Sequence, residues 1–540
     1  MKTVTITPCE CKNYTPRVRE AIEELGACGG VIKFEEGEYH FYREGALKVF
    51  LPVSNNDLCD KHVVFPIFDK KSIKIDGGGA NFVFHEVTFP FAVTNSSNIT
   101  FSNFTVDTAV TPVGVFTIGK VSHEGFYFGI DKEKTPYFIE DGALIFKREY
   151  GERSGKERMF GLHGISQWGV QYLFTGECKS SKENLPAKYV CVDAEEREDG
   201  LFLKYREENE YPIRYDEGAR VSSILDGGRD VDVMFFADSD TVKIENITVR
   251  RGIGMGVIAQ FTKDIEIDGF RTDESFHSCG STLTADSMHF VNCSGTLEIK
   301  NCEITHTMDD AINVHGAYTR VMAVNGDTVT VKIGHQQQYF VNPYKAGDTI
   351  FSLSDKSFDY TARLTVLDSH LSRDGASIDI KVGLLDGKVT VGELIESPYR
   401  MPAVHIHDNR FYHYPHLRIS GAGDIVIENN TFEYAIAALL GKDLAKYWYE
   451  SGRIKSLIFR NNVLKDCNAL AGISFITVDV DGVAHENTPK IHERVEIYSN
   501  RFEGIKDRAI TVAGVKELII RDNDFASEAD RVIYVDGKKI

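Results

Sequence analysis

The stretch HTMDDAINVHG, residues 306–316, places Asp309 and Asp310 side by side, a few positions ahead of Asn313 and His315. Another acid, Asp286, stands in TADSMHFVNCSG, 24 residues upstream of Asp310. Grouped carboxyl groups suit glycoside hydrolysis, in which one protonated acid serves the leaving oxygen and one carboxylate activates water or attacks. Crowding divides these roles because mutual repulsion raises the pKa of one member.

The alternative is an ordinary solvated turn, which an Asp-Asp dipeptide usually forms in an acidic protein. In a regular strand, side chains at successive positions point to opposite faces. Asp309 and Asp310 can therefore serve one site only if they straddle a transition from strand to turn.

The elements around these residues follow a repeat of short apolar alternations that end in Asn, Asp or Gly. Apart from two long interruptions, successive units begin about 20–40 residues apart, the period of a solenoid in which each coil covers the next. This pattern predicts a parallel β-helix, with Asn at the corners because it tolerates the left-handed backbone region. The units are residues 72–85, 97–107, 241–251, 264–273, 296–306, 424–435, 456–466, 494–504 and 517–527.

Adjacent rungs of such a stack lie about 4.8 Å apart. The separation between Asp286 and Asp310 is one coil, so the three carboxyl groups are expected to converge on one patch. A capping helix is predicted where Val18, Ala21, Ile22 and Leu25 fall at helical spacing, with Gly29 and Gly30 ending it.

Two blocks interrupt the repeat and show alternating strands joined by Gly and Asp turns, which predicts antiparallel β-barrel-like insertions. The expected division is residues 1–110 for the N-terminal part of the β-helix, 111–225 for the first insertion, 226–316 for the central part with the acidic coils, 317–403 for the second insertion and 404–540 for the C-terminal part.

Composition restricts the partners. The 540 residues carry 61 basic and 80 acidic side chains, a net charge of −19 without a basic tract, which disfavours nucleic acid and anionic membranes. The ten cysteines are expected to be free buried thiols. The N-terminus lacks an apolar signal-like segment, so we expect no export signal in this chain, and its compartment stays open between the cytoplasm and a secreted or periplasmic location.

The motifs DSMHFVNCSG and MDDAINVHG resemble those of glycoside hydrolase family 110, the α-1,3-galactosidases, and more distantly the aspartate triad of polygalacturonase-like hydrolases. The resemblance implies a right-handed β-helix with two barrel insertions. It also implies release of a terminal α-1,3-linked galactose with inversion, from blood group B or linear glycans, without metal or organic cofactor. Carried over residue by residue, it makes Asp286, Asp309 and Asp310 catalytic; among them we expect Asp310 to be the leading general acid, with Asp286 and Asp309 positioning or activating water. The Gly-His-Gly and Arg-x-Lys elements for uronate have no clear counterpart.

Other side chains near the acids are candidates for substrate contact, each with a structural alternative. His289, Asn313 and His315 could hydrogen-bond galactose hydroxyls or be satisfied internally. Arg229 could contact substrate or form a salt-bridged turn. Tyr412 or Tyr414 could stack on a sugar, although core packing is the commoner role. His405-x-His407 would share a strand face, but no carboxylate or cysteine at ligand spacing supports a metal.

Two other classes of function stay open. One is a uronate-acting, polygalacturonase-like hydrolase or a polysaccharide lyase on the same scaffold, of which the lyase would need a Lys or Arg base and usually Ca²⁺. A non-catalytic carbohydrate-binding β-helix would not need carboxylates from neighbouring coils. The flank of a solenoid can pair with a second copy, so a homo-oligomer is also left open.

Overall fold

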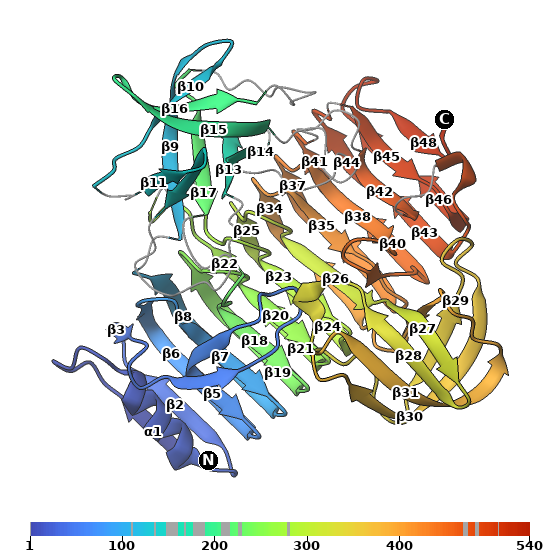
Figure 1. Cartoon of the computed structure of the whole chain (residues 1–540), viewed down its shortest axis with the longest axis horizontal. Helices are drawn as coiled ribbons and strands as arrows, with labels where there is room; N and C mark the ends of the chain where they lie inside the picture. The colour runs from blue at the N-terminus through green and yellow to red at the C-terminus, as the bar shows by residue number, and fades with distance from the viewer. Residues whose placement is uncertain are drawn as a thin grey trace.

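The computed structural model describes residues 2–540 except for 110–111, 134–136, 147–159, 167–168, 176–189, 207–216, 225–228, 278–280, 468–473, 481–484 and 506. Its body is a stack of coils that runs from the N-terminus to the C-terminus, with two β-barrels projecting from it (Figure 1). The predicted fold class is confirmed. No helix among the described residues is long and apolar enough to cross a bilayer.

Two parallel sheets form the coils, and we call the 20-stranded one sheet A and the 14-stranded one sheet B. The longer strands of sheet A are β1 (Lys2–Ile6), β2 (Gly30–Phe34), β6 (Lys71–Phe84), β8 (Ser97–Thr108), β19 (Asp240–Val249), β21 (Lys263–Asp268), β24 (Ser294–Lys300), β33 (Ala403–His407), β36 (Asp424–Glu428), β40 (Ser456–Arg460), β43 (His492–Tyr498) and β46 (Val515–Arg521). Its shorter strands are β3 (Glu38–Phe41), β22 (Arg271–Thr272), β25 (Glu303–Thr305), β34 (Arg410–Tyr412), β37 (Thr431–Glu433), β41 (Val463–Lys465), β44 (Arg501–Glu503) and β47 (Asp524–Phe525).

Sheet B contains the strands that directly follow Asp286 and the pair Asp309 and Asp310 in the sequence. Its parallel strands are β5 (Asp60–Phe68), β7 (Phe89–Thr94), β18 (Met234–Ala237), β20 (Val257–Gln260), β23 (Met288–Val291), β26 (Ile312–Ala317), β35 (His416–Ile419), β38 (Ala437–Asp443), β42 (Ser474–Val480), β45 (Arg508–Val512) and β48 (Ile533–Val535). Antiparallel additions are β4 (Leu47–Phe50), β39 (Glu450–Ser451) and β49 (Lys538–Lys539), and a short 3-10 turn, η2 (His485–Asn487), lies between β42 and β43.

The sequence repeat explains the coils. Alternate apolar residues point inward and form one continuous core in which equivalent rings stack, as Phe411, Phe432 and Phe459 do. Asn side chains link successive corners: the amide of Asn409 donates to Asn430 Oδ1, and Asn430 donates to Asn462 Oδ1. The predicted left-handed Asn corners are also present, for example at Asn429 and Asn461, both with φ of 56°.

The predicted helix is α1 (Thr15–Leu25), which buries Val18, Ala21, Ile22 and Leu25. It ends at Leu25, before Gly26 rather than at Gly29–Gly30, because Gly26 already takes a positive φ of 62°.

The first barrel lies between β8 and β18 and closes in the order β10-β16-β15-β14-β13-β17-β9. All its pairs are antiparallel except β14 with β15. Its strands are β9 (Val113–Val121), β10 (Gly125–Gly129), β13 (Phe160–Ser166), β14 (Gly169–Thr175), β15 (Val190–Arg197), β16 (Gly200–Tyr205) and β17 (Arg220–Ile224), with a hairpin of β11 (Tyr137–Glu140) and β12 (Ala143–Phe146) beside them.

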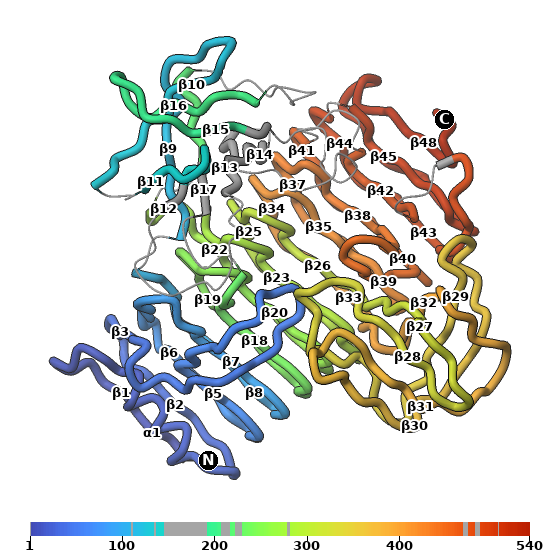
Figure 2. The backbone as a smooth tube through the Cα atoms, viewed as in Figure 1, coloured from blue at the N-terminus to red at the C-terminus, as the bar shows by residue number. Residues whose placement is uncertain are grey.

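The second barrel lies between β26 and β33, and all of its pairs are antiparallel. It consists of β27 (Thr319–Asn325), β28 (Thr328–Ile333), η1 (Gln336–Gln338), β29 (Thr349–Leu353), β30 (Tyr360–Leu371), β31 (Ser377–Gly387) and β32 (Leu394–Glu396). In Figure 2 its yellow tube meets the blue loop between β4 and β5 near the middle of the stack. Gln337 Nε2 donates to Asp57 Oδ1 across this contact.

The cysteine prediction is wrong in part. Cys9 and Cys11 form a disulfide, because the exposed loop after β1 brings their Cα atoms to 5.3 Å. Cys28 is free but exposed, and Cys59 is half-buried, whereas Cys293, Cys302 and Cys467 are free and buried as expected. Cys178, Cys279 and the side chain of Cys191 lie outside the described residues.

Candidate active site

The three aspartates converge on adjacent coils. β23 and β26 are parallel neighbours with Met288 aligned to Ile312, so Asp286 and Asp310, each two residues earlier, lie on consecutive rungs. The backbone amide of Ser287 donates to Asp310 O at 2.8 Å and fixes this alignment. Carboxyl oxygens of Asp286, Asp309 and Asp310 all lie within 4.8 Å of one another.

The neighbouring aspartates reach one patch because they lie in a bend, between the end of β25 at Thr305 and the start of β26 at Ile312. The Thr307 hydroxyl donates to Asp309 O, and Asp310 N donates to Asp309 Oδ1. Side chains do not alternate strictly between opposite faces in this bend, so the adjacent Asp309 and Asp310 can reach the same patch, as we expected from the sequence.

The three carboxyl groups differ in exposure and partners. Asp286 and Asp310 are buried, whereas the side chain of Asp309 is 39% exposed. Arg229 Nη2 lies 2.6 Å from Asp309 Oδ2. His416 Nε2 lies 2.5 Å from Asp310 Oδ1, and Asn313 Nδ2 donates to Asp310 Oδ2 at 3.1 Å. Solvent therefore reaches the cluster at Asp309, while Asp310 is covered by two donors.

Burial and mutual repulsion set the protonation of the cluster. Burial, followed by the charge of Asp310, raises the pKa of Asp286 well above its usual value. Burial is the largest cause that raises the pKa of Asp309, to about 7, and Arg229 opposes the shift. Burial alone would lower the pKa of His416, but Asp310 outweighs it and the pKa is raised. An imidazolium therefore faces Asp310, and Asp286 and Asp309 can each hold a proton near neutral pH.

A histidine chain behind Asp286 leads to the same protonation state. His289 Nδ1 lies 2.5 Å from Asp286 Oδ2, His289 Nε2 lies 2.9 Å from His315 Nε2, and His315 Nδ1 lies 2.6 Å from the carbonyl of Gly316. Burial lowers the pKa of both histidines to about 4, so both rings are neutral.

Counting donors along this chain locates the proton. The Gly316 carbonyl can only accept, so His315 carries its hydrogen on Nδ1 and accepts at Nε2. His289 must then donate from Nε2 and accept at Nδ1. The remaining donor is the carboxyl of Asp286, which is therefore protonated.

A buried ion pair extends the chain. Glu450 Oε1 lies 3.7 Å from His315 Nε2, and Arg418 Nε lies 2.8 Å from Glu450 Oε2. Burial would raise the pKa of Glu450, but the pKa is lowered, and because His315 is neutral the charge that keeps this carboxylate ionised is that of Arg418. β39, which carries Glu450, pairs antiparallel with β26 and so closes the end of this network.

The residues that the sequence suggested as substrate contacts fall into two groups in the structure, those that contact Asp309 or Asp310 and those that are buried away from these two. Arg229 contacts Asp309, and Asn313 contacts Asp310. His289 and His315 are buried behind Asp286, where they hold the carboxyl instead of facing solvent. The prediction for Tyr414 is wrong: its side chain is fully buried in the core beside Phe411, because the residue points inward from its coil. Its alternative, Tyr412, is half-buried and contacts Glu303 on sheet A.

Sequence reasoning missed His416, Arg418 and Glu450. His416 begins β35, which aligns with β26 through Leu417 and Ile312. If the residues of the second barrel are left out of the count, His416 falls one coil after Asp310 and therefore next to it. Glu450 gives no such signal because its strand leaves the regular coil.

An aromatic group lies beside the cluster. The ring of His335, in the second barrel, is 4.2 Å from the ring of Trp448 and 5.7 Å from that of Tyr447. Trp448 lies two residues before Glu450 in the chain, so this group adjoins the buried pair of Glu450 and Arg418. Burial lowers the pKa of His335. Tyr447 is 59% exposed.

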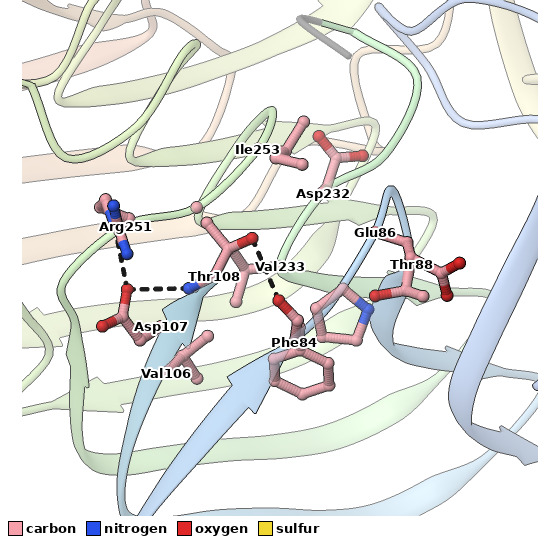
Figure 3. A pocket seen from close by; sticks show the side chains of 12 residues that line it. Phe84, Glu86, Thr88, Val106, Asp107, Thr108, Asp232, Val233, Arg251 and Ile253 are labelled. Atoms are coloured by element: carbon pink, nitrogen blue, oxygen red, sulfur yellow. Dashed lines mark hydrogen bonds and ion pairs between the residues drawn. The ribbon is translucent and has the colours of Figure 1, made fainter. Parts of the chain in front are cut away.

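A separate pocket lies on the N-terminal side of the cluster (Figure 3). Asp107 and Arg251 face each other there, with Arg251 Nε 3.1 Å from Asp107 Oδ1, and His277 also contacts Asp107. Asp232, which lines this pocket, holds the same position on its coil as Asp286 and Asp310 hold on theirs. The strand pairing shows this, because Met234 pairs with Val257 and Val257 pairs with Met288. None of the three clustered aspartates lines this pocket.

The aspartate cluster could also hold a cation, because its three carboxyl groups lie within ligand distance of one another. Arg229 and His416 already place positive charge against Asp309 and Asp310, however, and Asp286 is protonated. The donor set as it stands suits proton transfer better than metal binding.

Fold and site together define a β-helix protein with an acid–base cluster on its coils. The chain is 27% identical to α-1,3-galactosidase A of Shewanella woodyi over 93% of its length and 81% of that protein. It is also 27% identical to α-1,3-galactosidase B of Bacteroides thetaiotaomicron, over 91% of its length and 80% of that protein. No family model matches the sequence. The predicted resemblance to the α-1,3-galactosidases is thus confirmed, and the protein is a glycoside hydrolase.

Solved structures show more distant similarity. A family 28 exopolygalacturonase of Yersinia enterocolitica matches 100% of this chain and 79% of its own, with a TM-score of 0.41 and 11% identity. The polygalacturonase of Erwinia carotovora matches 98% of this chain and 96% of its own, with a TM-score of 0.39 and 8% identity. Similarity of this degree carries no weight for function.

Proposed function

We propose that the protein releases terminal α-1,3-linked galactose from glycans by exo-hydrolysis, on blood group B or linear substrates. The observation that carries the proposal is the convergence of Asp286, Asp309 and Asp310 from adjacent coils. The names of relatives similar over nine-tenths of the chain supply the sugar and the linkage.

The contacts favour a division of roles that differs from the sequence expectation, in which Asp310 was the leading general acid. Asp309 is the better acid, because it is open to solvent and its pKa of about 7 lets it hold a proton and release it. Asp310, between His416 and Asn313, activates the water. Asp286, kept protonated by the histidine chain through Oδ2, positions that water with its other carboxyl oxygen.

Inversion is the part of the proposal that rests on family resemblance. In usual inverting enzymes the acid and base stand about 6.5–9.5 Å apart, and in retaining enzymes about 5–5.5 Å. Here the nearest oxygens lie within 4.8 Å. In our scheme two carboxyl groups hold the water, so the distance between one acid and one base does not predict whether the anomeric configuration is inverted or retained. Proton NMR of the first product settles it: we expect the β-anomer of galactose, and initial α-galactose contradicts inversion.

A uronate-acting hydrolase or lyase fits the site less well. Such enzymes need basic groups free to bind carboxylates of the polymer. Arg229 and Arg418 lie near the cluster, but each is paired with an acid of the protein, Asp309 and Glu450 respectively. A purely binding β-helix would have no use for a buried carboxyl cluster, whose burial and repulsion cost stability.

The direct test is incubation of the protein with p-nitrophenyl α-galactoside and with a Gal-α1,3-Gal disaccharide, each with and without EDTA. We expect galactose release from both, unaffected by chelator. An unsaturated product absorbing near 235 nm with calcium dependence supports the lyase, and no release from either substrate contradicts the proposed activity. A fucosylated blood group B trisaccharide assayed in parallel measures tolerance for the branch.

A further inference from the structure

A second group of potential ligands lies on the outer face of sheet A. His405 and His407 alternate on β33, so both point outward, and their rings stack at 4.1 Å. Glu298 on β24 aligns with His405, and Glu428 on β36 aligns with His407. The histidine pair is thus flanked by a carboxylate from each neighbouring coil.

Each carboxylate offers one oxygen to the histidines. His407 Nε2 lies 3.4 Å from Glu298 Oε1, and His405 Nε2 lies 2.9 Å from Glu428 Oε1. The other oxygens are held by bases, with Lys300 Nζ 2.7 Å from Glu298 Oε2 and Arg460 Nε 2.7 Å from Glu428 Oε2. The carboxylates are therefore fixed in place with one oxygen each turned toward the imidazoles.

The orientation of His407 matches that of a metal ligand. Its Nδ1 lies 2.7 Å from Asp408 Oδ2, which leaves Nε2 directed at Glu298. Metal-bound histidines usually have such a carboxylate on the second ring nitrogen. The 3.4 Å separation between His407 Nε2 and Glu298 Oε1 equals the edge of a tetrahedron whose bonds are about 2.0–2.1 Å long, as in zinc sites.

We propose that Glu298, His405 and His407 bind one zinc-like divalent transition ion, with Glu428 or water as the fourth ligand. Donor atoms of the first three lie within 4.8 Å of one another. The sequence argued against a metal here because no carboxylate stands near His405-x-His407 at ligand spacing. Stacking of coils supplies it from β24, on the far side of the second barrel in sequence.

The ion would act as a structural cross-link. β24 precedes the second barrel and β33 follows it, so the ion joins the two coils between which the barrel is inserted. An ion that binds only the folded chain stabilises it by mass action. The aspartate cluster lies at the start of strands of sheet B, and the cross-link takes no part in its chemistry.

The test uses the full-length protein, treated with EDTA and desalted, in calorimetric titration with zinc chloride at pH 7.5. A Cys28→Ser background removes the exposed thiol as a competing ligand. We expect one equivalent to bind, at least tenfold weaker binding in His407→Ala and in the milder His407→Gln, and no change in His370→Ala, an exposed histidine of the second barrel. Cobalt bound in place of zinc should show the strong visible absorption of tetrahedral coordination.

Thermal melting gives a second readout. Saturating zinc should raise the melting temperature of the parent by a few degrees and that of His407→Ala by less than one degree. Absence of binding, or binding equally tight in the His407 variants and the parent, overturns the proposal. Galactoside hydrolysis is expected to be the same in all these variants, so a failed zinc site leaves the proposed activity untouched.

Discussion

Replacement of Asp309 by asparagine should lower activity and raise stability, and the gain in stability should grow with pH. Burial is the largest cause that raises the pKa of Asp309 to about 7, from an ordinary value of 3.8. The folded protein therefore binds this proton more tightly than the unfolded chain does. Stability falls as pH rises through this interval, and the full penalty is present above about pH 7.

The size of the effect follows from the shift. About three pKa units at 1.36 kcal/mol each would give roughly 4 kcal/mol for a fully enclosed group. The side chain of Asp309 is 39% exposed, and solvent screening reduces the figure to about 1–2 kcal/mol. Asparagine cannot lose a proton and escapes this penalty. The attraction of Arg229 for the ionised carboxylate opposes the rise in pKa and is already contained in the value of about 7.

The measurement is the difference in melting temperature between Asp309→Asn and the parent at pH 5, 6, 7 and 8. We expect this difference to shift in favour of the variant by about 1–3 °C across the range and to level off above pH 7. Asp386→Asn, at an exposed position on the second barrel, serves as the control and should give a constant difference. A difference for Asp309→Asn that stays constant or falls with pH refutes the reasoning about the cluster.

Three further variants test the site. Asp310→Asn should keep the fold and lose about 10²–10⁴-fold in kcat, as expected for a positioned acid or base; a near-normal rate excludes Asp310 from the chemistry. His416→Gln removes the charge-assisted partner of Asp310, worth about 2 kcal/mol, so kcat should fall roughly 30-fold. The pKa of His416 is raised, so the stability it adds is complete below pH 6.5 and is lost as pH rises through the folded value; a stability deficit of the variant that grows with pH contradicts the pairing. If the ring of Trp448 stacks on the second sugar, Trp448→Ala should raise KM for the disaccharide several-fold and leave KM for p-nitrophenyl α-galactoside nearly unchanged; an equal rise for both contradicts this stacking.

The fold was predictable because one pattern recurs along the chain. Alternating apolar residues and Asn corners indicated the coils, and the 24-residue step from Asp286 to Asp310 predicted their convergence. The disulfide between Cys9 and Cys11 and the end of α1 at Leu25 were missed, since each depends on local backbone geometry that residue spacing does not encode.

The surroundings of the aspartates were harder to predict. The position of a residue along its coil does not give the direction of its side chain, so both stacking on a sugar and core packing stayed open for Tyr414, whose side chain points into the core. His416 and Glu450 were missed because the second barrel and an irregular loop interrupt the count. Stacking across an insertion also brought Glu298 to the histidine pair of β33, which no local motif could indicate.

The insertion of the second barrel between β26 and β35 has a consequence for biosynthesis. β26 is synthesised with Asp310, but its next neighbour in sheet B appears only about 100 residues later, with His416. The edge of β26 therefore stays unpaired on the nascent chain while the second barrel folds. An unpaired strand edge is prone to aggregate at this stage. Nascent chains that stop short of Glu450 should lack a working site, so activity is acquired late in translation, all at once rather than coil by coil.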